Sequence, residues 1–300
     1  MSKPLKPAWV VGEVLMDLIP LSDGKRIPMV GGGPANTAKA VAKLGYGVSF
    51  VGGISSDDFG KAIERELANN GVDLASVYRG HQPTALAIAT IDESGIAKYD
   101  FELEGTASFA FDQSWLPAGE PEVIHVGSVA TLLEPGSSEL LAWAEKKSAP
   151  IVFDPNVRPS IQGDKEIYRK AVERWINIAS IVKLSEDDMK WLYGDEDVVG
   201  DFISRGVSIV IVTRAEKGLT AYRDGAIIDV PAVKVELVDS VGAGDTIGAV
   251  IVEGILNFGI DELQGDVLRE VLERATRAAG ITCSRAGANP PWKEELDLAL

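Results

Sequence analysis

The chain has 300 residues, 46% hydrophobic and 25% charged, which suits one large globular domain or one domain with a small appendage. Its 29 basic and 45 acidic side chains give a net charge of −16, which opposes nucleic-acid or membrane binding as a main role. The single cysteine, Cys283, excludes an intrachain disulfide and a cysteine-rich metal site. No signal-peptide-like start and no apolar run of membrane-spanning length are found, so we expect a cytoplasmic protein.

Taken in chain order, short apolar runs alternate with amphipathic stretches. Residues 8–12 and 48–51 predict strands, and between them Pro34 predicts the start of an alanine-rich helix that ends at Gly45. Asp57 is expected to cap a helix that ends at Gly71. Buried strands are predicted at residues 123–126, 151–153, 181–183 and 207–212, and a helix at residues 246–258. A helix that starts near Asp164 is predicted to place four apolar residues on one face: Ile167, Ala171, Trp175 and Ile178.

This alternation predicts an α/β fold, in which a mostly parallel sheet lies between two layers of helices. Two segments interrupt it. Residues 14–30 are extended, with a hairpin signal at Asp23-Gly24, and residues 84–101 read as strand, turn (92–95) and strand. We therefore expect a core of residues 1–13, 36–82 and 113–300, and a small β lid of residues 14–35 and 83–112.

The segment Asp239-Ser-Val-Gly-Ala-Gly-Asp245 carries the strongest chemical signal. Gly242, Ala243 and Gly244 leave the backbone N–H groups accessible just before a helix, whose N-terminus is a ready anion site. Asp245 would place a base beside an anion hole, as phosphoryl transfer needs. The spacing alone leaves a second interpretation equally open, in which Asp245 only caps the helix and the glycines only form a turn. The helix N-terminus is also expected to lower the pKa of Asp245.

The segment Gly31-Gly-Gly-Pro-Ala-Asn36 also enters a helix. It lacks the last glycine of a dinucleotide-binding fingerprint, so binding of NAD is disfavoured. Gly32, Gly33 and Asn36 suit neutral hydroxyls such as those of a sugar, although a tight turn into a helix explains them as well. Asp17 follows a strand and is a candidate for sugar hydroxyls, although such a residue is more often part of a turn.

Other kinds of site find little support. No Walker A sequence is present, which removes the P-loop kinases. His81 and His125 are isolated from any serine, cysteine or metal-spaced partner, so a catalytic triad or a zinc site is not expected and His125 is interpreted as structural.

These segments, in this order, resemble the ribokinase-like (PfkB) carbohydrate kinases. The C-terminal signature of that family is approximated by residues 239–246, and its N-terminal one by residues 32–36 with Gly45 following. Further stretches are similar to the fructokinase branch: residues 12–17, 101–107, 154–159, 183–186 and 283–291. The resemblance covers nearly the whole chain.

The resemblance implies a three-layer α/β/α core with a β lid that often forms a dimer contact. It implies that Asp245 is the base and that the amides of Gly242, Ala243, Gly244 and Asp245 form the anion hole. Its remaining implications concern four groups of binding residues. Sugar would be held by Asp17, Gly32, Gly33 and Asn36; nucleotide phosphate by Lys183, Thr213 and Gly218; Mg²⁺, usually through water, by Glu186. Backbone carbonyls near Asp239 and Val241, with the loop at residues 284–287, would hold a monovalent cation such as K⁺.

The resemblance also assigns Arg158, and for this residue and for the pair Lys183 and Glu186 a purely structural interpretation stays open. Arg158 would contact sugar or the transferred phosphate, and a surface ion pair explains it about as well. Lys183 and Glu186 match the family motif, and a solvated helix start at residues 185–188 would also account for them.

Four positions depart from the family pattern. Ala215 stands where glycine is common, Ile247 where phenylalanine is favoured, and Val250 where a small residue is usual; these bear on nucleotide fit and helix packing. Ser108 stands where related fructokinases often carry aspartate, over the sugar.

The reaction expected from the resemblance is transfer of the γ-phosphoryl of ATP to D-fructose, giving fructose 6-phosphate. Alternatives are 2-keto-3-deoxygluconate or ribose as the acceptor, or a sugar-binding regulator that has lost catalysis. A keto acid would want an added basic contact, and the predicted lid offers few: Lys25, Arg26 and Lys98. The intact Gly-Ala-Gly-Asp run argues against a regulator. The expected partners are a small sugar and ATP.

Overall fold

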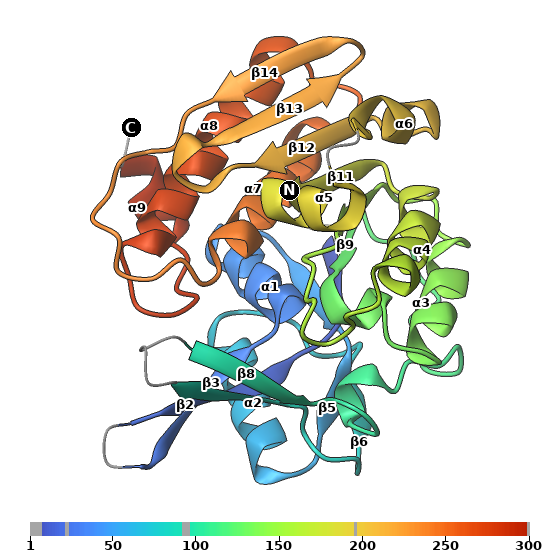
Figure 1. Cartoon of the computed structure of the whole chain (residues 1–300), viewed down its shortest axis with the longest axis vertical. Helices are drawn as coiled ribbons and strands as arrows, with labels where there is room; N and C mark the ends of the chain where they lie inside the picture. The colour runs from blue at the N-terminus through green and yellow to red at the C-terminus, as the bar shows by residue number, and fades with distance from the viewer. Residues whose placement is uncertain (1–7, 22–23, 92–96, 195–196, 299–300) are drawn as a thin grey trace, which may run out of the picture.

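An eight-stranded sheet forms the centre of the molecule (Figure 1). The computed structural model describes residues 8–21, 24–91, 97–194 and 197–298. The strand order is β14-β13-β12-β11-β10-β9-β1-β4, and β12 through β4 run parallel. The strands are β1 (Ala8–Val11), β4 (Val48–Val51), β9 (Val123–Gly127), β10 (Ile151–Asp154), β11 (Ile181–Ser185), β12 (Ile209–Thr213), β13 (Leu219–Arg223) and β14 (Ala226–Val230). The predicted mostly parallel sheet is confirmed, whereas the antiparallel β13–β14 hairpin is an element that the apolar pattern did not predict.

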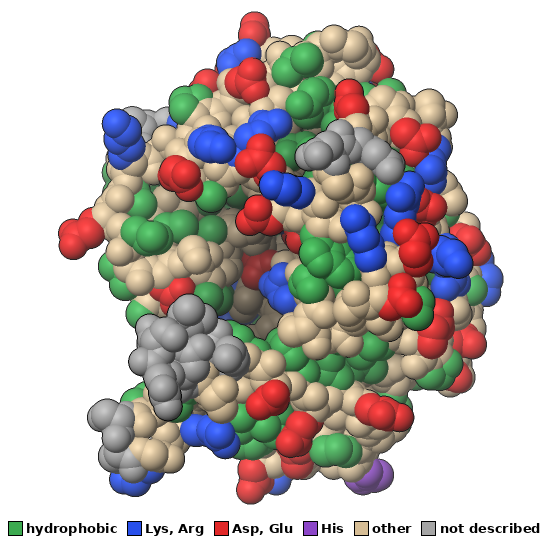
Figure 2. All heavy atoms as spheres, in the orientation of Figure 1, with side chains coloured by type: hydrophobic (Ala, Val, Ile, Leu, Met, Phe, Trp, Pro, Cys, Tyr) green, Lys and Arg blue, Asp and Glu red, His purple; other side chains and the backbone are tan. Residues whose placement is uncertain are grey.

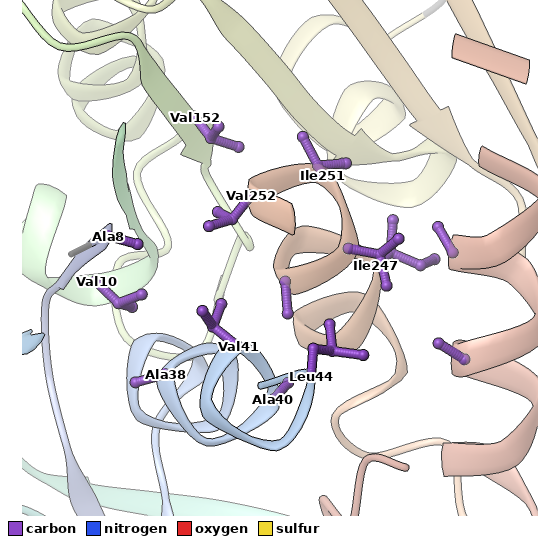
Figure 3. Packing of buried hydrophobic residues seen from close by; sticks show 14 of the residues in the cluster. Ala8, Val10, Ala38, Ala40, Val41, Leu44, Val152, Ile247, Ile251 and Val252 are labelled. Carbon is purple, nitrogen blue, oxygen red and sulfur yellow. The ribbon is translucent and has the colours of Figure 1, made fainter. Parts of the chain in front are cut away.

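Helices cover both faces of this sheet, as predicted. One layer contains α1 (Gly33–Lys43), α2 (Asp58–Asn69), α7 (Ala243–Phe258) and α8 (Gly265–Cys283), and α9 (Lys293–Leu298) lies against α8. The other layer contains α3 (Gly136–Ala144), α4 (Lys165–Ile176), α5 (Glu186–Tyr193) and α6 (Val199–Ser204). Alternate residues of β1 serve the two layers, Ala8 and Val10 on one side and Trp9 and Val11 on the other. Figure 3 shows α1 and α7 packed closely together over the first of these faces. None of the helices in the described ranges combines the length and apolar character that a membrane span requires.

The predicted helix caps are present, but the buried face of α4 differs from the predicted one. The Asp57 carboxylate accepts a hydrogen bond from Gly60 N at 2.7 Å, and Asp164 caps α4 in the same way. On α4 the buried side chains are Tyr168, Val172, Trp175 and Ile176, whereas Ile167 is 52% exposed. The prediction was wrong for Ile167 because Tyr168 fixes the rotation of the helix. Its ring packs edge-on against Trp191.

A second sheet of four strands lies beside one end of the central sheet (Figure 1). Its order is β3 (Arg26–Gly31), β2 (Leu15–Pro20), β7 (Leu86–Ile91) and β8 (Ala97–Glu102), and a short pair is formed by β5 (Gly53–Ser55) and β6 (Tyr78–Gly80). The two interrupting segments supply the four strands; the predicted turns at Asp23 and 92–95 lie outside the described residues. The turn η1 (Ala107–Phe109) ties this second sheet to the core, because the Ser108 hydroxyl donates to the carbonyl O of Val14 and lies 3.3 Å from that of Gly53.

The carboxyl ends of the parallel strands lead toward the second sheet, and Figure 2 shows a hollow between the two, with acidic and basic side chains in its wall. Three polar residues interrupt the apolar sheet face beneath α7: His125, Asp154 and Lys183. Burial lowers the pKa of His125 to about 3, and a β-carbon on Gly248 would lie 2.8 Å from its Nε2. His125 is thus a neutral residue packed in the core, while Asp154 ends β10 and Lys183 lies in the middle of β11.

Candidate functional site

The N-terminus of α7 opens into this region without a side-chain cap. The helix begins at Ala243, three residues before the predicted start, and Gly242 is its N-cap with a φ of 80°. That backbone favours glycine, and a β-carbon there would also lie 2.6 Å from the Cβ of Ala288. The described residues supply no acceptor for the amides of Gly244 and Asp245. These N–H groups and the positive end of the helix dipole remain available to an anion.

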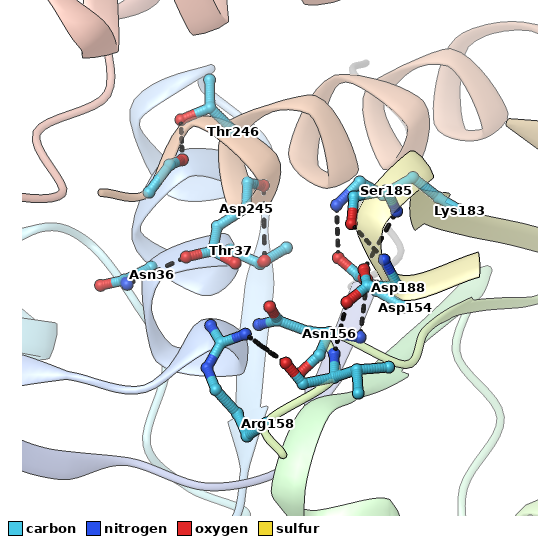
Figure 4. A network of polar contacts seen from close by, with 12 residues as sticks. Asn36, Thr37, Asp154, Asn156, Arg158, Lys183, Ser185, Asp188, Asp245 and Thr246 are labelled. Atoms are coloured by element: carbon cyan, nitrogen blue, oxygen red, sulfur yellow. Dashed lines mark hydrogen bonds and ion pairs between the residues drawn. The ribbon is translucent and has the colours of Figure 1, made fainter. Parts of the chain in front are cut away.

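Asp245 lies in the first turn of α7, after the N-cap, so the interpretation as a mere cap is not supported. Its Oδ2 accepts a hydrogen bond from Asn36 Nδ2 at 3.0 Å, and its backbone O accepts one from Thr37 Oγ1 at 3.4 Å (Figure 4). Burial raises the pKa of Asp245 to about 6, although Asn36 and Lys183 act in the opposite direction. The expectation that the helix N-terminus lowers this pKa is wrong, because the loss of hydration outweighs it.

Gly33 borders a narrow space in front of Asp245 that has no room for a side chain at this position. A β-carbon on Gly33 would lie 2.8 Å from Asn156 Nδ2, 3.2 Å from Asp245 Oδ1 and 3.8 Å from the Cβ of Ser128. Ser128 and Asn156 have φ values of 59° and 39°, in the left-handed region that residues other than glycine seldom adopt. The wall of this space is therefore built partly from strained turns that follow β9 and β10.

Asp17, on β2, faces the same region from the second sheet. A β-carbon on Gly31 would lie 2.1 Å from Asp17 Oδ2, so the carboxylate rests on the glycine backbone. Burial raises the pKa of Asp17 to about 6, against the influence of Lys39 and Arg158. Within the described ranges no donor forms a hydrogen bond with this carboxylate, which leaves its oxygens free for a ligand.

Arg158 and Gly32 have different roles. The Arg158 guanidinium donates to the backbone carbonyl oxygens of Asn156 and Val157, at 3.2 and 3.0 Å. No carboxylate among the described residues pairs with it, so the surface-ion-pair interpretation is not supported. Gly32 is the N-cap of α1 with a φ of 104°, and a β-carbon there would lie 2.8 Å from the carbonyl O of Glu13. Gly32 therefore serves the turn into α1.

Lys183 is a buried cation beside the start of α7. Its Nζ lies 2.6 Å from Asp154 Oδ2, with both side chains 6% exposed (Figure 4). Burial lowers the pKa of Lys183, but Asp154 outweighs this effect, so the pKa lies above its ordinary value and the ammonium stays charged. A β-carbon on Gly244 would lie 3.0 Å from Nζ. The interpretation of Lys183 as part of a solvated helix start is therefore wrong, because its side chain is buried.

A cleft of about 890 Å³ extends from this point across the strand ends. Among its lining residues are the predicted Lys183, Glu186, Thr213, Gly218, Ala243 and Gly244, together with Asn156 and Arg158. Its other wall is largely apolar, with Val233, Val235, Leu237, Ile247, Ala279 and Cys283. The cleft combines a cationic end beside α7 with an apolar wall. This combination complements a nucleotide, which has anionic phosphates and a largely apolar base.

Glu186 begins α5, behind the N-cap Ser185. Its side chain is 47% exposed and lies 3.3 Å from Arg214 Nε and 3.8 Å from Lys217 Nζ. Within the described ranges no three His, Cys, Asp or Glu side chains converge closely enough to hold a metal ion by themselves. One exposed carboxylate in the cleft wall fits Mg²⁺, which usually keeps water and is bound through one or two carboxylates plus phosphates.

Thr213 and Gly218 flank the turn η3 (Ala215–Lys217) at the end of β12. Gly218 has a φ of 99°, and a β-carbon there would lie 2.1 Å from Val230 O, so the position requires glycine. Ala215, where the family often has glycine, has a φ of 47°. The backbone of this turn therefore keeps a glycine-like conformation although the sequence departs from the pattern. Ile247 and Val250, the other departures on this side, are buried against the core.

Asp239 joins the two segments that were expected to hold a monovalent cation. Its Oδ1 accepts from Val241 N at 3.0 Å, and its Oδ2 accepts from Gly287 N at 2.9 Å. The stretch before α7 and the loop after α8 are therefore in direct contact.

The structure thus brings most of the predicted residues into one region. Asp245, Asn36 and Gly33 converge, and Lys183 links them to the cleft. Three residues that the sequence prediction did not assign also belong here: Ser128, Asp154 and Asn156. The signal for two of them was available, because both lie in the quoted stretch 154–159 at a strand end.

Comparison with known proteins agrees with this arrangement. The model of the "pfkB family carbohydrate kinase" family matches residues 7–295. The chain is similar to the fructokinase of Escherichia coli, with 28% identity covering 96% of this chain and 97% of the relative, and to that of Salmonella typhimurium, with 30% identity covering 97% of each. It is also similar to the crystal structure of fructokinase from Xylella fastidiosa with bound ATP, with a TM-score of 0.89, 25% identity and 98% of each chain covered.

Proposed function

The chain belongs to the pfkB family of carbohydrate kinases, and from that premise we propose that it is a fructokinase, which converts ATP and D-fructose to ADP and fructose 6-phosphate. The choice of fructose is supported by the relatives, which carry that name at 28% and 30% identity over nearly the whole chain. The assignment of the chemistry is carried by one observation, the Asp245–Asn36 pair at the uncapped start of α7.

Asp245 is the proposed general base. Asn36 holds its Oδ2, so Oδ1, which faces Gly33, is the oxygen that accepts the proton from the sugar hydroxyl. With a pKa of about 6, the carboxylate is ionised at neutral pH and is more basic than an ordinary aspartate. This base suffices for in-line transfer, because the proton need not leave early in a loose phosphoryl-transfer transition state.

The sugar is proposed to lie between α1 and the second sheet. Asp17 offers a carboxylate with free oxygens, and Asn156 Nδ2 and the Gly33 amide face the space in front of the base. Arg158 stands at the border between this space and the cleft, where it can reach the sugar or the transferred group. The second sheet is proposed to act as a lid that excludes water from the site.

The transferred phosphoryl is proposed to rest on the free amides of Gly244 and Asp245 and beside the Lys183 ammonium. Asp154 keeps that ammonium charged and in place. The rest of ATP would fill the cleft, with its base against the apolar wall and its phosphates toward Lys183 and the Thr213–Gly218 turn.

Two cations are proposed as well. Mg²⁺ supplies charge neutralisation at the ATP phosphates when it is bound, and Glu186 would hold it through water. A monovalent cation such as K⁺ would be held by backbone carbonyls near Asp239 and Val241, where the Asp239 side chain already joins the two segments.

We also propose a cytoplasmic location, where ATP is available, and a homodimer formed through the second sheet. The dimer is supported by apolar side chains on that sheet, since Ile27, Met29 and Tyr99 are each more than 40% exposed. Sedimentation analysis tests the dimer: a monomer at micromolar concentration would contradict it.

The function is tested by ADP release from ATP and Mg²⁺ with D-fructose, ribose and 2-keto-3-deoxygluconate, using Asp245→Ala as the inactive control. We expect kcat/KM for fructose to exceed that for the other sugars by at least about tenfold. A higher value for another sugar would show that fructose is the wrong substrate. Fructose binding in calorimetry without ADP release would instead favour the sugar-binding regulator.

A further inference from the structure

Lys43 is a buried cation at the C-terminal end of α1. Its Nζ donates to Asn289 Oδ1 at 2.9 Å and to the carbonyl O of Pro290 at 3.2 Å, and it lies 5.3 Å from the ring centre of Trp292. The side chain is buried, and among the described residues no carboxylate forms an ion pair with it. All its direct partners are neutral groups from one short segment, residues 289–292.

The two residues that precede this segment, Gly287 and Ala288, pack directly behind the proposed anion hole. A β-carbon on Gly242 would lie 2.6 Å from the Cβ of Ala288, so the glycine that starts α7 rests on Ala288. One residue earlier, the Gly287 amide donates to Asp239 Oδ2 at 2.9 Å. Residues 287 and 288 therefore support both sides of the backbone that leads into α7.

Helix α1 thus contacts the site at both of its ends. Near its start, Asn36 holds the carboxylate of Asp245, and at its end Lys43 holds Asn289, the residue that follows the Ala288 on which Gly242 rests. Small shifts of backbone donors are costly to catalysis, because their value depends on orientation toward the developing charge. We propose that Lys43 is a positioning residue for phosphoryl transfer, which fixes residues 287–290 against Gly242 and so orients the N–H donors of α7.

A purely stabilising role fits Lys43 less well. An ammonium that exchanges water for a few neutral oxygens gains little net free energy, and an apolar side chain of similar length often serves stability as well. Replacement by methionine removes the hold on Asn289 and Pro290 and leaves their oxygens without this donor, so a modest fall in stability is expected beside the change in kcat, and the arginine variant separates the two roles.

The test compares Lys43→Met and Lys43→Arg with the wild type and with Lys293→Met. Lys293 follows the same segment but pairs with Asp297 on its own helix, so it controls for the loss of one positive charge. The measurements are kcat and KM for ATP and sugar, the urea midpoint, and the rate of tryptic cleavage after Arg285, which lies in the loop.

We expect Lys43→Met to lower kcat about tenfold to a hundredfold, with sugar KM within about threefold of the wild type and only a modest fall in the urea midpoint. Cleavage after Arg285 should be faster in this variant. Lys43→Arg, which keeps donors and charge, should recover most of kcat, and Lys293→Met should behave as the wild type.

A kcat of Lys43→Met within twofold of the wild type would overturn the proposal. A loss of kcat that is accompanied by a large fall in the urea midpoint and is not recovered in Lys43→Arg would overturn it as well. The proposal rests on the proposed kinase function, and the two can fail separately. A wild type without turnover on any sugar overturns the function and this proposal with it. An active wild type with an equally active Lys43→Met variant overturns this proposal alone.

Discussion

Replacing Asp245 by asparagine is expected to stabilise the protein at neutral pH while it removes turnover. The pKa of about 6, compared with the ordinary 3.8, means that ionising this carboxyl costs at most about 3 kcal/mol more in the folded than in the unfolded state. An amide oxygen in place of Oδ2 can still accept the hydrogen bond from Asn36 Nδ2. The substitution therefore removes the charge and keeps the contacts.

The effect has a definite dependence on pH. Below about pH 3.8 the carboxyl is protonated in both states, so the wild type and Asp245→Asn should be similarly stable. As the pH rises, the unfolded state ionises first, so the wild type loses stability until the pH passes about 6. Above that pH the variant should keep a constant advantage of at most about 3 kcal/mol.

Urea unfolding followed by tryptophan fluorescence, for both proteins at several pH values between 4 and 8, measures this difference. Asp58→Asn, an exposed carboxylate at the start of α2, controls for the loss of one negative charge. Turnover of Asp245→Asn should fall by about 10² to 10⁴. An advantage that does not grow with pH, or a variant less stable than the wild type at pH 7.5, would refute the role of burial in setting this pKa.

Three further predictions concern single side chains. Because Asp17 and Asp245 both have a pKa of about 6, a plot of log kcat/KM against pH should have a slope near two below that pH, and Asp17→Asn should reduce the slope to one. A slope of one in the wild type would contradict the need for both charges. Ala215→Gly should raise the free energy of unfolding by about 0.5–1 kcal/mol in urea, because the residue has a φ of 47°, and a loss of stability would show that the alanine is not strained. Ser108→Asp should lower the stability of the protein by at least about 2 kcal/mol, since the new carboxylate would face the carbonyl oxygens of Val14 and Gly53. Ser108→Ala loses only the hydroxyl and is the milder control, so equal melting temperatures for the two variants would contradict the prediction.

The residues at the start of α7 could be predicted because their signal is local. Gly242, Gly244 and Asp245 lie within four positions of one another, and the helix pattern that follows fixes their place. Asn36 is separated by 209 residues from the carboxylate it holds; its residue type and the resemblance both suggested contact with a sugar, and its bond to Asp245 was not predicted.

The electrostatics of the site could not be predicted in this way. The pKa of Asp245 depends on burial by α1 and on charges at residues 154 and 183, all distant in the chain, so the helix dipole considered alone predicted the wrong direction. Ser128 and Asn156 were missed for a related reason. Their left-handed backbone is imposed by the ends of β9 and β10; serine does not signal it, and asparagine, which is enriched in this region, signals a turn and not a site.

The charge of the whole chain and the charge of the site act in opposite directions. A net charge of −16 repels ATP at a distance, but this repulsion is screened beyond about 8 Å at physiological salt. Within that distance the ligand meets Lys183, which is shielded from salt by its burial, and the amides of α7, which act at hydrogen-bond distance. The same burial that strengthens these donors raises the pKa of Asp245, so the anion site and the base share one physical cause. It follows that a substitution that opens the site to water should both weaken phosphate binding and lower the pKa of Asp245.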